Sequence, residues 1–524
     1  MNSSLHVTAC ASAVLFVISI AMFLRWMKAE SHLRLPPGPN RIPLLSNVHQ
    51  LPMQSPERKY AGDIVFAKLF KTPTLVINSL QVAQELLDKR SSKYSYRPDF
   101  ILLSDLMGWD CVITHMTYGD RFRKHRRWIS NAFQDKHSLG SYRPLQRREA
   151  YMLLSGLLQS PELFRSHIKR FAAAMILQIA YGHSVTSLDD KFIHLAERAG
   201  KETVEYGSAG VMLVDLFPFL KHIPLWMPGS GFKSRAFEIR DLVRKMLDTP
   251  FEMVKDAMKS GTASPCLTAT LLEEVLSKRA PTAEDEDDIK GTAGVLYGAA
   301  TDTTVAVLST FILAMVLHPE VYEKAQAEVD RVVGQDRLPE FEDRESLPYL
   351  ECVVKEVFRW NCPVPLGLPH KLISNDQYQG FDIPGGSMVI PNIWGMTRND
   401  SFYPEPEMFR PERFEQMDRE TAEARDPRKM VFGFGRRICP GQDFADASIW
   451  IAIASIVATL DIGVTTDEAG KQAPPTGSFV PGLVSHPEEF SCKITPRSEQ
   501  VKTVVFEMGE YLCHSYVLGS LRAF

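Results

Sequence analysis

The sequence of 524 residues lacks paired cysteines. Its eight cysteines are dispersed, without a Cys-x-x-Cys motif, and are Cys10, Cys111, Cys266, Cys352, Cys362, Cys439, Cys492 and Cys513. Structural zinc sites and the disulfide frameworks of small secreted proteins both need clustered or paired cysteines. The sequence therefore indicates neither of these. It favours a reducing compartment, in which a functional cysteine must be recognised by its neighbours.

The sequence also lacks an excess of positive charge. Charged residues make up 23% of the chain and the net charge is −4, whereas nucleic-acid-binding proteins usually carry a basic excess. No repeat of fixed period, nicotinamide or flavin fingerprint, or iron–sulfur cysteine cluster is present. These absences argue against a nucleic-acid partner and against a built-in electron-transfer domain. With 45% hydrophobic residues, the chain can bury one large core or two ordinary ones.

Charge is absent from the N-terminal segment between Leu5 and Leu24. Twenty helical residues span roughly 30 Å, which is enough for the core of a bilayer. A cleaved signal peptide is the alternative, but it would need Lys or Arg before the apolar stretch. The positive charges instead follow it, at Arg25, Lys28 and Arg34. This predicts a retained membrane anchor over residues 1–28, with the rest of the chain in the cytoplasm.

Prolines dominate the next segment, residues 29–44. Pro36, Pro37, Pro39 and Pro43 cannot continue a helix. Such a density of prolines is typical of a stiff, extended connector. We therefore expect a hinge that keeps the globular body at a fixed attitude to the membrane.

Helical periodicity dominates the body of the chain. Two short stretches before the longer helices are strand-like, Ile64–Leu69 and Thr74–Asn78. The predicted helices are Gln81–Lys89, Arg121–Phe133, Phe164–Tyr181, Ala236–Ser260, Asp288–Leu317, Pro319–Val333, Tyr349–Trp360 and Ala445–Leu460. We interpret the acidic run Glu284–Asp288 as a solvated loop whose end favours the start of the next helix. The pattern predicts a mainly α fold with small β-sheets.

One cysteine lies in a distinctive loop, Phe432-Gly433-Phe434-Gly435-Arg436-Arg437-Ile438-Cys439-Pro440-Gly441. A thiolate needs cationic groups, a helix N-terminus or a metal to lower its pKa. Gly435 and Gly441 permit a tight turn beside a flat cofactor, and Arg437 suits a carboxylate. A buried structural cysteine is the alternative. However, the five fixed positions Phe-x-x-Gly-x-Arg-x-Cys-x-Gly arise by chance in roughly two of ten thousand such chains.

This loop resembles the signature of the cytochrome P-450 superfamily. The resemblance implies the cytochrome P-450 fold, a triangular helical body with haem b (heme b) between a long oxygen-activation helix and the cysteine loop. Cys439 would be the axial ligand of the haem iron. Phe432, Gly435, Arg437 and Gly441 would shape the cofactor site. Thiolate donation would favour cleavage of the O–O bond.

A second motif of the superfamily is Glu-x-x-Arg on a helix before the cysteine. The pattern alone is weak, since it also begins at Glu162, Glu328 and Glu407. Only Glu356–Arg359 precedes a proline-rich stretch, as the superfamily requires, and residues three apart share a helix face. The resemblance adds Arg413, from Pro411-Glu412-Arg413-Phe414. These three residues should form a buried, structural charge network.

The segment Gly298-Ala299-Ala300-Thr301-Asp302-Thr303-Thr304 lies within a long apolar helix. Burying a carboxylate and several hydroxyls in an apolar core is unfavourable unless these groups have hydrogen-bond partners or a catalytic role. The resemblance implies that Thr303 bonds iron-bound dioxygen or water and that Asp302 relays protons. Ala300 replaces the usual glycine, which narrows the expected oxygen groove. The alternative is that the threonines only bond back to helix carbonyls.

The resemblance also implies ligands for the haem propionates. Arg126 ends a stretch in which Phe122 replaces the usual tryptophan, so the indole hydrogen bond is lost. His370 occupies a position where related fungal enzymes bind a propionate. The alternative is that His370 is an ordinary exposed histidine.

Partners follow from the same resemblance. Electrons would come from NADPH–cytochrome P-450 reductase, with cytochrome b5 as a further candidate donor, at the endoplasmic reticulum membrane. We hypothesise a basic docking face for this reductase, drawn from Arg121, Arg123, Lys124, Arg127, Lys429 and Arg436. A generally solvated basic surface is the alternative.

The substrate is expected to be lipophilic, because the predicted pocket walls are mostly apolar. These walls are Phe100–Met107, Val295, Ala299, Val364–Leu368 and Val480–Val484. The resemblance is to fungal enzymes of natural-product pathways, which favours hydroxylation of a terpenoid or polyketide intermediate. Oxidation of aromatic xenobiotics, a haem-thiolate isomerase or dehydratase that needs no external electrons, and a haem sensor or carrier remain open.

The resemblance extends from about Leu35 to Pro496, which predicts a haem-thiolate catalytic domain over residues 45–497. The chain between Leu51 and Asp63 is short for the first helix of the family. Residues 498–524 form a C-terminal extension without a counterpart, whose apolar residues could pack locally.

Overall fold

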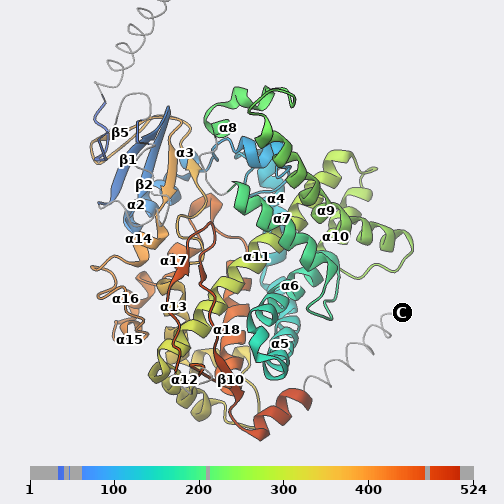
Figure 1. The fold of residues 1–524 in the computed structure, drawn as a ribbon, viewed down its shortest axis with the longest axis vertical. Helices are drawn as coiled ribbons and strands as arrows, with labels where there is room; N and C mark the ends of the chain where they lie inside the picture. The colour runs from blue at the N-terminus through green and yellow to red at the C-terminus, as the bar shows by residue number, and fades with distance from the viewer. Residues whose placement is uncertain (1–32, 41–45, 48–61, 208–212, 467–471, 508–524) are drawn as a thin grey trace, which may run out of the picture.

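The computed structural model describes residues 33–40, 46–47, 62–207, 213–466 and 472–507. The predicted membrane anchor, part of the predicted hinge, the short region after Leu51 and the end of the C-terminal extension lie outside these residues. Helices make up most of the described chain, and its strands are short (Figure 1). The predicted mainly α fold with small β-sheets is confirmed.

The longer helices form the main body of the molecule (Figure 1). They are α4 (Asp120–Phe133), α5 (Lys136–Gln159), α6 (Phe164–Tyr181), α7 (Lys191–Gly207), α9 (Gly231–Lys259), α10 (Leu267–Leu276), α11 (Ala283–Leu317), α12 (Pro319–Val332), α13 (Pro348–Trp360) and α18 (Gln442–Thr459). Short α-helices lie between them, namely α2 (Leu80–Ala83), α3 (Ser91–Tyr94), α8 (Leu213–Leu216), α14 (Ile393–Thr397), α15 (Glu412–Glu415), α16 (Arg419–Ala424) and α17 (Arg428–Val431). Single turns of other helix types are η3 (Gln84–Lys89), η4 (Ile101–Leu106), η5 (Pro161–Leu163), η6 (Pro218–His222), η7 (Phe341–Ser346) and η8 (Gly435–Arg437).

Most predicted helices are correct to within a few residues. The segment Phe164–Tyr181 matches α6 at both ends. The segment Gln81–Lys89 is helical, but only Leu80–Ala83 is α-helix, and the chain then widens into the π-helical turn η3. The helices α5, α7 and α10 were not singled out from the sequence. For α5 the reason is visible, since it contains Pro144, a residue that usually marks a helix boundary.

A four-stranded sheet lies at one end of the molecule, beside the N-terminal part of the described chain (Figure 1). Its order is β1 (Ile64–Leu69), β2 (Thr72–Ile77), β6 (Met388–Pro391) and β3 (His370–Lys371). β1 and β2 form an antiparallel hairpin, β2 is parallel to β6, and β3 is antiparallel to β6. Both predicted strands are confirmed. The other pairs are β4 (Asp376–Tyr378) with β5 (Phe381–Ile383), β7 (Leu460–Gly463) with β10 (Lys493–Pro496), and β8 (Phe479–Val480) with β9 (His486–Pro487).

The described part of the predicted hinge, residues 33–40, is tied to these strands. The Arg34 amide donates to the Asp382 carboxylate at 2.9 Å, and the Arg34 carbonyl accepts from the Asp382 amide at 2.7 Å. The Pro37 carbonyl accepts from the amide of Phe66 in β1 at 2.8 Å. Bonds to both β1 and β5 fix the direction in which the chain enters the body.

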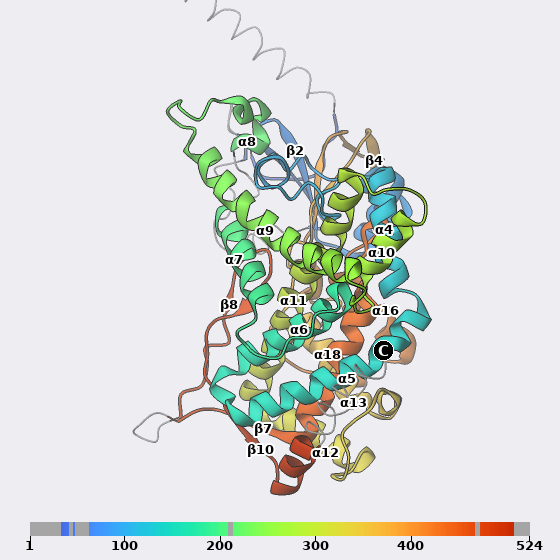
Figure 2. The same cartoon turned by 90° about the vertical axis from the view of Figure 1, so that its right-hand side faces the viewer.

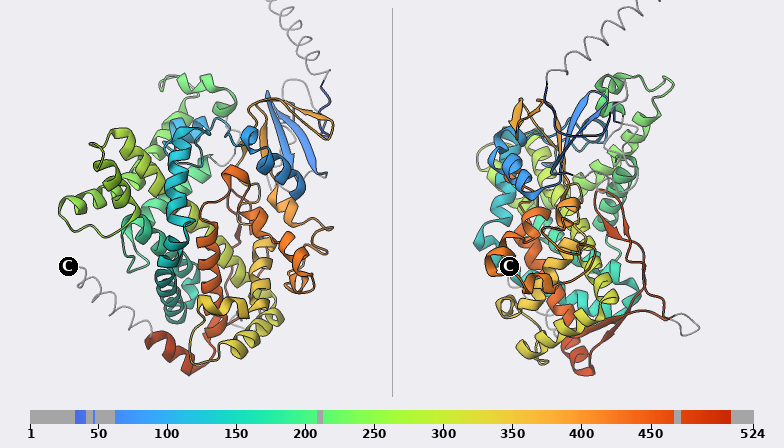
Figure 3. Two further views of the ribbon diagram at one scale, coloured as in Figure 1. Left: turned by 180° about the vertical axis from the view of Figure 1, so that it is seen from behind. Right: turned by 90° about the vertical axis from the view of Figure 1, so that its left-hand side faces the viewer.

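The central element of the core is α11, which runs between the other long helices (Figures 2 and 3). By length and hydropathy α11 could cross a membrane, but 78% of its most apolar window is buried inside the protein. An apolar helix that neighbours cover over most of its surface is the expected centre of a large helical core. The described start of the C-terminal extension joins the same core, because Val505 is fully buried.

The acidic run Glu284–Asp288 is not a loop, contrary to the sequence interpretation, but the first turns of α11. Thr282 and Asp285 form a capping box, in which each side chain accepts a hydrogen bond from the backbone of the other. The buried Asp288 pairs with basic residues of α4. Acidic groups satisfy the free amides and the dipole of a helix start. The charges therefore extend the helix rather than precede it.

Candidate active site

The cysteine loop joins α17 to α18 through the single turn η8. The amide of Cys439 donates to the carbonyl of Phe432 at 2.7 Å, which closes the loop. Gly435 has a φ of 55°, and a Cβ atom there would lie 2.1 Å from the carbonyl oxygen of Leu87. Only glycine fits this left-handed, crowded position. The loop therefore holds its cysteine at a fixed place beside η3.

The Cys439 thiol lies among protein groups that act on its charge in opposite directions. Burial raises the pKa of the Cys439 thiol, whereas the backbone N–H of Gly441 and the charge of Arg126 lower it. The sulfur is not in a disulfide. Because burial dominates, a bound cation is needed to keep the sulfur as a thiolate at neutral pH.

Three arginines, the buried Arg97 and the partly buried Arg126 and Arg437, lie near one another and have no carboxylate partner within the described residues. Burial lowers the pKa of each, and the charge of Arg437 further lowers that of Arg97. They donate to backbone carbonyls, which are those of Thr114, Leu368 and Pro369 for Arg97, Ile438 for Arg126, and Ser95, Ile113 and Met116 for Arg437. Buried cations without counter-ions are costly. The cluster therefore fits an anionic group.

His370 lies on the edge strand β3 and is only 5% exposed, so it is not an ordinary exposed histidine. Its Nδ1 lies 2.8 Å from the carbonyl oxygen of Tyr94, and since a carbonyl only accepts, this nitrogen carries the proton. Burial, followed by the charge of Arg97, lowers the pKa of His370 to about 3. The imidazole is neutral here, with its Nε2 unprotonated. A carboxylate beside it would favour protonation of that nitrogen.

The middle of α11 has an accessible face, although most of the helix is buried. Gly298, Ala299 and Asp302 are exposed, whereas Val295 is buried. A Cβ atom at Gly298 would meet no other atom within 4 Å. The Thr303 hydroxyl donates to the Ala299 carbonyl at 2.8 Å, the back-bonded arrangement that threonines adopt in helices. This face combines small residues with one acid and one hydroxyl.

Asp302 has a partner that the sequence did not indicate. His486 Nε2, on β9, lies 3.0 Å from Asp302 Oδ1, and the two side chains are 29% and 55% exposed, respectively. This contact ties the accessible face of α11 to the segment between β8 and β9.

The three residues of the expected charge network lie together. Arg359 donates through two nitrogens to the Glu356 carboxylate, at 2.7 and 2.8 Å, and Arg413 donates to it at 3.0 Å. Glu356 and Arg359 are fully buried and Arg413 is 2% exposed. The remaining arginine donors reach the carbonyls of Thr397, Pro404, Glu405, Pro406 and Met408. The network fastens α13 to α15 and to the loop before it.

Residues 36–494 match the sequence profile of the family described as Cytochrome P-450. The chain belongs to the cytochrome P-450 family. Cytochrome P-450 monooxygenase 176 of Postia placenta is 46% identical over 504 residues, which cover 94% of this chain and 97% of the relative. Cytochrome P-450 monooxygenase claR of Ampulloclitocybe clavipes is 39% identical, over 91% and 89% of the two chains. The resemblance seen in the sequence is thereby confirmed, and the chain is an oxidoreductase of the monooxygenase type.

The residues around Cys439 fit the haem that membership of the P-450 family implies. No group of three or more His, Cys, Asp or Glu in the described residues could hold a metal ion. A single sulfur therefore suits a metal that brings its other ligands with it, as a porphyrin does. The buried and partly buried arginines without carboxylate partners suit propionates, and the small residues of α11 leave room for a flat ring.

The basic residues expected to bind a reductase are partly neutralised within this P-450. Arg121 and Lys124 both pair with Asp288, Arg123 pairs with Asp120, and Lys429 lies 3.8 Å from Glu423. Arg127 and Arg436 are exposed and have no ion-pair partner in the part of the chain described here. They are the members of the set whose charge is freest to act on a partner.

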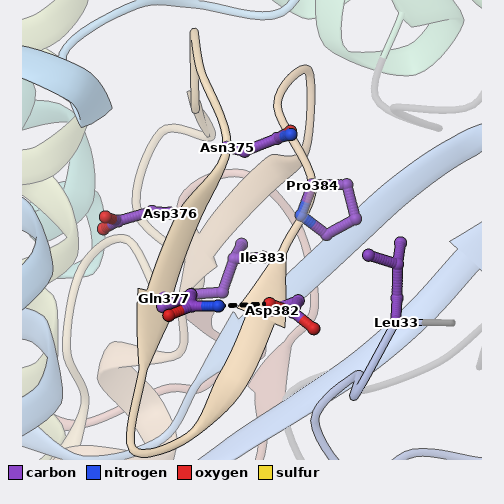
Figure 4. Close-up of a pocket in the computed structure, with 7 residues that line it drawn as sticks. All are labelled: Leu33, Asn375, Asp376, Gln377, Asp382, Ile383 and Pro384. Atoms are coloured by element: carbon purple, nitrogen blue, oxygen red, sulfur yellow. Dashed lines mark hydrogen bonds between the residues drawn. The ribbon is translucent and has the colours of Figure 1, made fainter.

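A surface hollow lies between Leu33 and the β4–β5 hairpin (Figure 4). Gln377 bonds across it to Asp382 at 2.8 Å, while the Asp376 carboxylate points away from it (Figure 4). Asp376 is bonded to Arg90, Lys93 and Tyr94. None of the motif residues lines this hollow. It forms part of the attachment of the hinge, not of the P-450 site.

Two site residues were missed by the sequence reasoning, Arg97 and His486. Arg97 lies outside all the sequence motifs described above. Its burial beside Arg437 depends on the packing of segments that are far apart in the sequence. His486 lies two residues after the predicted pocket wall Val480–Val484, and this proximity was its only local signal. Both become visible only once the chain is folded.

Proposed function

We propose that this P-450 is a membrane-anchored monooxygenase that hydroxylates a lipophilic small molecule, with O₂ and with electrons from NADPH–cytochrome P-450 reductase. The observation that carries the proposal is the loop around Cys439, which offers one fixed sulfur beside buried and partly buried cations. When bound, haem would supply oxygen activation at a thiolate-held iron. A haem-thiolate isomerase or dehydratase, which needs no external electrons, would leave the acid and the hydroxyl on the accessible face of α11 without a role.

Cofactor binding is assigned to the buried and partly buried residues of the site. Cys439 would hold the iron, and its loop amides would tune the electron donation of the sulfur. Arg97, Arg126 and Arg437 would hold the propionates by charge-assisted hydrogen bonds. His370 would join them in its protonated form, which an adjacent carboxylate stabilises.

Proton handling is assigned to Thr303 and Asp302. The Thr303 hydroxyl already donates to the Ala299 carbonyl, so its oxygen is free to accept a hydrogen bond. Asp302 lies one residue away with an accessible carboxylate. The role proposed for the two residues is proton transfer from the acid, through the hydroxyl, to the accessible face of α11.

The proposed substrate is a terpenoid or polyketide intermediate of fungal secondary metabolism. The predicted pocket walls are mostly apolar, and Ile101, Leu102, Leu106 and Val295 among them are buried. An apolar lining with few fixed charges favours a lipophilic, uncharged substrate. The fungal origin of the relatives supports the same assignment.

Membrane attachment is proposed through residues 1–28, at the endoplasmic reticulum, with the catalytic domain 45–497 on the cytosolic side. The tie of the hinge to β1 and β5 supports a fixed entry direction. Arg127 and Arg436 are the proposed contribution of this P-450 to reductase docking. Reversing both charges should then weaken reductase-supported turnover and its dependence on salt.

The test is a reduced carbon-monoxide difference spectrum, followed by product formation with NADPH and reductase on a panel of lipophilic compounds. The wild-type protein should show the Soret position of a thiolate-ligated haem, and Cys439→Ala should not. Turnover should require both NADPH and reductase. A purified protein without porphyrin, or with porphyrin on another ligand, would refute the assignment.

A further inference from the structure

The contact between Asp302 and His486 joins two elements that the proposed reaction brings together. Asp302 lies on the accessible face of α11, one residue before Thr303. His486 lies on β9, at the end of the segment expected to wall the substrate pocket, with its Nε2 3.0 Å from Asp302 Oδ1. Among the described residues, His486 is the only basic side chain within ion-pair distance of Asp302.

A buried polar network fixes the backbone beside His486. The neighbouring Ser485 donates its hydroxyl to Asn361 Oδ1 at 2.9 Å, and Asn361 donates back to the Ser485 carbonyl at 3.1 Å. Asn361 also donates to the Thr310 hydroxyl on α11 at 3.0 Å. The amide of Ser485 donates to the Pro363 carbonyl at 2.9 Å. These contacts attach β9 to α13 and α11 without any help from the imidazole.

Because its backbone is already fixed, His486 meets Asp302 at a small cost in conformational entropy. The pair contributes little to stability, since more than half of the Asp302 side chain is exposed. The effect of the pair is instead electrostatic. The pKa of buried Tyr297 is raised mainly by burial and further by Glu197, Asp190 and Asp302, so negative charge collects around this stretch of α11. His486 is the basic group that lies against Asp302 within this negative region.

We propose that His486 is a positioning residue for Asp302, which holds the carboxylate on the accessible face of α11 and restores its proton. The inference rests on the proposed monooxygenase function. In the ion-paired state, the proton on His486 Nε2 passes to the Asp302 carboxylate at Oδ1, and Asp302 then gives a proton toward Thr303. The neutral imidazole then takes a proton from solvent, which reaches a ring that is 29% exposed. Charge and protons balance over the cycle.

The experiment is a double-mutant cycle with His486→Asn, Asp302→Asn and the combined variant, all as full-length, haem-loaded protein. His486→Asn should lower the ratio of product to NADPH consumed by about tenfold, as expected for one lost charge-assisted hydrogen bond. It should also raise the solvent deuterium isotope effect on kcat. The combined variant should be no worse than Asp302→Asn, because His486 acts through Asp302.

Two further measurements separate positioning from a structural role. Hydrogen exchange of the peptide over 478–488 should not change in His486→Asn, because Ser485 and Asn361 hold β9. The ferrous carbon-monoxide spectrum should stay at the thiolate position. His194→Asn, which breaks an exposed pair with Asp189, is the matched control and should leave coupling unchanged. If His486→Asn failed to fold, His486→Gln would take its place.

Different results would contradict the monooxygenase function and the positioning role of His486. Wild-type protein without a thiolate-type spectrum or without reductase-supported turnover would overturn the monooxygenase function itself. Normal wild-type turnover with unchanged coupling in His486→Asn would overturn only the role of His486. Multiplicative losses in the combined variant, or faster hydrogen exchange at β9 that accounts for the loss, would also overturn it.

Discussion

The hydroxyl of Thr303 donates its proton back into α11, to the carbonyl of Ala299 at 2.8 Å. This bond orients the hydroxyl oxygen without using its acceptor capacity. The hydrogen bond to the helix carbonyl is therefore compatible with a role of Thr303 in proton transfer. The sequence had suggested the two as alternatives. The same geometry makes the hydroxyl easy to remove without harm to the helix.

We expect Thr303→Val to lower the ratio of product to NADPH consumed by at least about tenfold, because an isosteric methyl group cannot relay a proton. Thr303→Ser keeps the hydroxyl and should retain most of the coupling. Peroxide released and product formed, measured together, test this. Equal coupling in the Val and Ser variants would argue that the hydroxyl has no part in proton transfer.

Arg97 illustrates how a residue outside any motif can matter for cofactor retention. Its guanidinium donates to three backbone carbonyls and lies near Arg437, with no carboxylate among the described residues to compensate it. A bound propionate would relieve this buried charge. The arginine and the cofactor should therefore stabilise each other.

Arg97→Leu should accelerate haem transfer to apomyoglobin by about tenfold or more, the effect of losing one charge-assisted contact. Arg143→Leu, which breaks an exposed ion pair with Glu342, is the control and should not alter the transfer rate. Identical rates in the two variants would remove Arg97 from the cofactor site.

At the scale of elements, the network of Glu356, Arg359 and Arg413 fastens α13 to α15. All three side chains are buried, and every arginine nitrogen that bonds reaches either Glu356 or a backbone carbonyl. Removing the acid would leave two buried cations without a partner, and this costs more than an ordinary lost hydrogen bond.

Glu356→Gln is expected to lower the free energy of unfolding by about 3–5 kcal/mol. Glu342→Gln removes the exposed partner of Arg143 and should cost less than about 1 kcal/mol. Urea unfolding followed by circular dichroism compares the two. Similar midpoints for both variants would contradict a structural role for the network.

The sequence could predict those features whose physical cause is local. The glycines and arginines around Cys439 lie within one loop, and Glu356 and Arg359 share one helix face, so their spacing alone revealed them. The acidic run Glu284–Asp288 was misread because a loop and a helix start favour the same composition. Packing against α4 decides between them, and Arg121, Lys124 and Asp288 are far apart in the sequence.

At the scale of the whole molecule, buried neutral histidines make stability depend on pH. Burial lowers the pKa of His370 to about 3 and that of His115 to about 4. Below the unfolded value of about 6.5, the unfolded chain binds protons that the folded chain does not. Their contribution is therefore complete above about pH 6.5 and is lost as the pH falls toward the folded values.

For the haem-free protein, His370 alone should cost about 2 kcal/mol of unfolding free energy between pH 7 and pH 5. His370→Gln, which cannot titrate, should show a shallower loss over this range, whereas the exposed control His222→Gln should follow the wild type. Denaturant titrations at both pH values test this. Parallel curves for His370→Gln and the wild type would mean that His370 is not neutral in the folded protein.

The segment that follows α8 lies at the end of the molecule where the described chain begins (Figure 1), and it carries exposed apolar side chains. Phe219 is 66% exposed and Trp226 is 80% exposed, on the segment that follows α8. Phe217 of the same segment contacts Phe70, at the turn between β1 and β2, with ring centroids 5.5 Å apart. Exposed aromatic clusters are typical of membrane or protein contacts, and tryptophan favours the membrane interface.

Because the hinge is tied to β1 and β5, a membrane anchor before it would bring this end of the body to the bilayer. Trp226 should then lie within reach of the lipids. In full-length protein reconstituted into bilayers, brominated acyl chains should quench tryptophan fluorescence, and Trp226→Phe should remove much of this quenching. Trp450→Phe, at a fully buried position, should leave it unchanged. Equal quenching in Trp226→Phe and wild type would place another face of the body against the membrane.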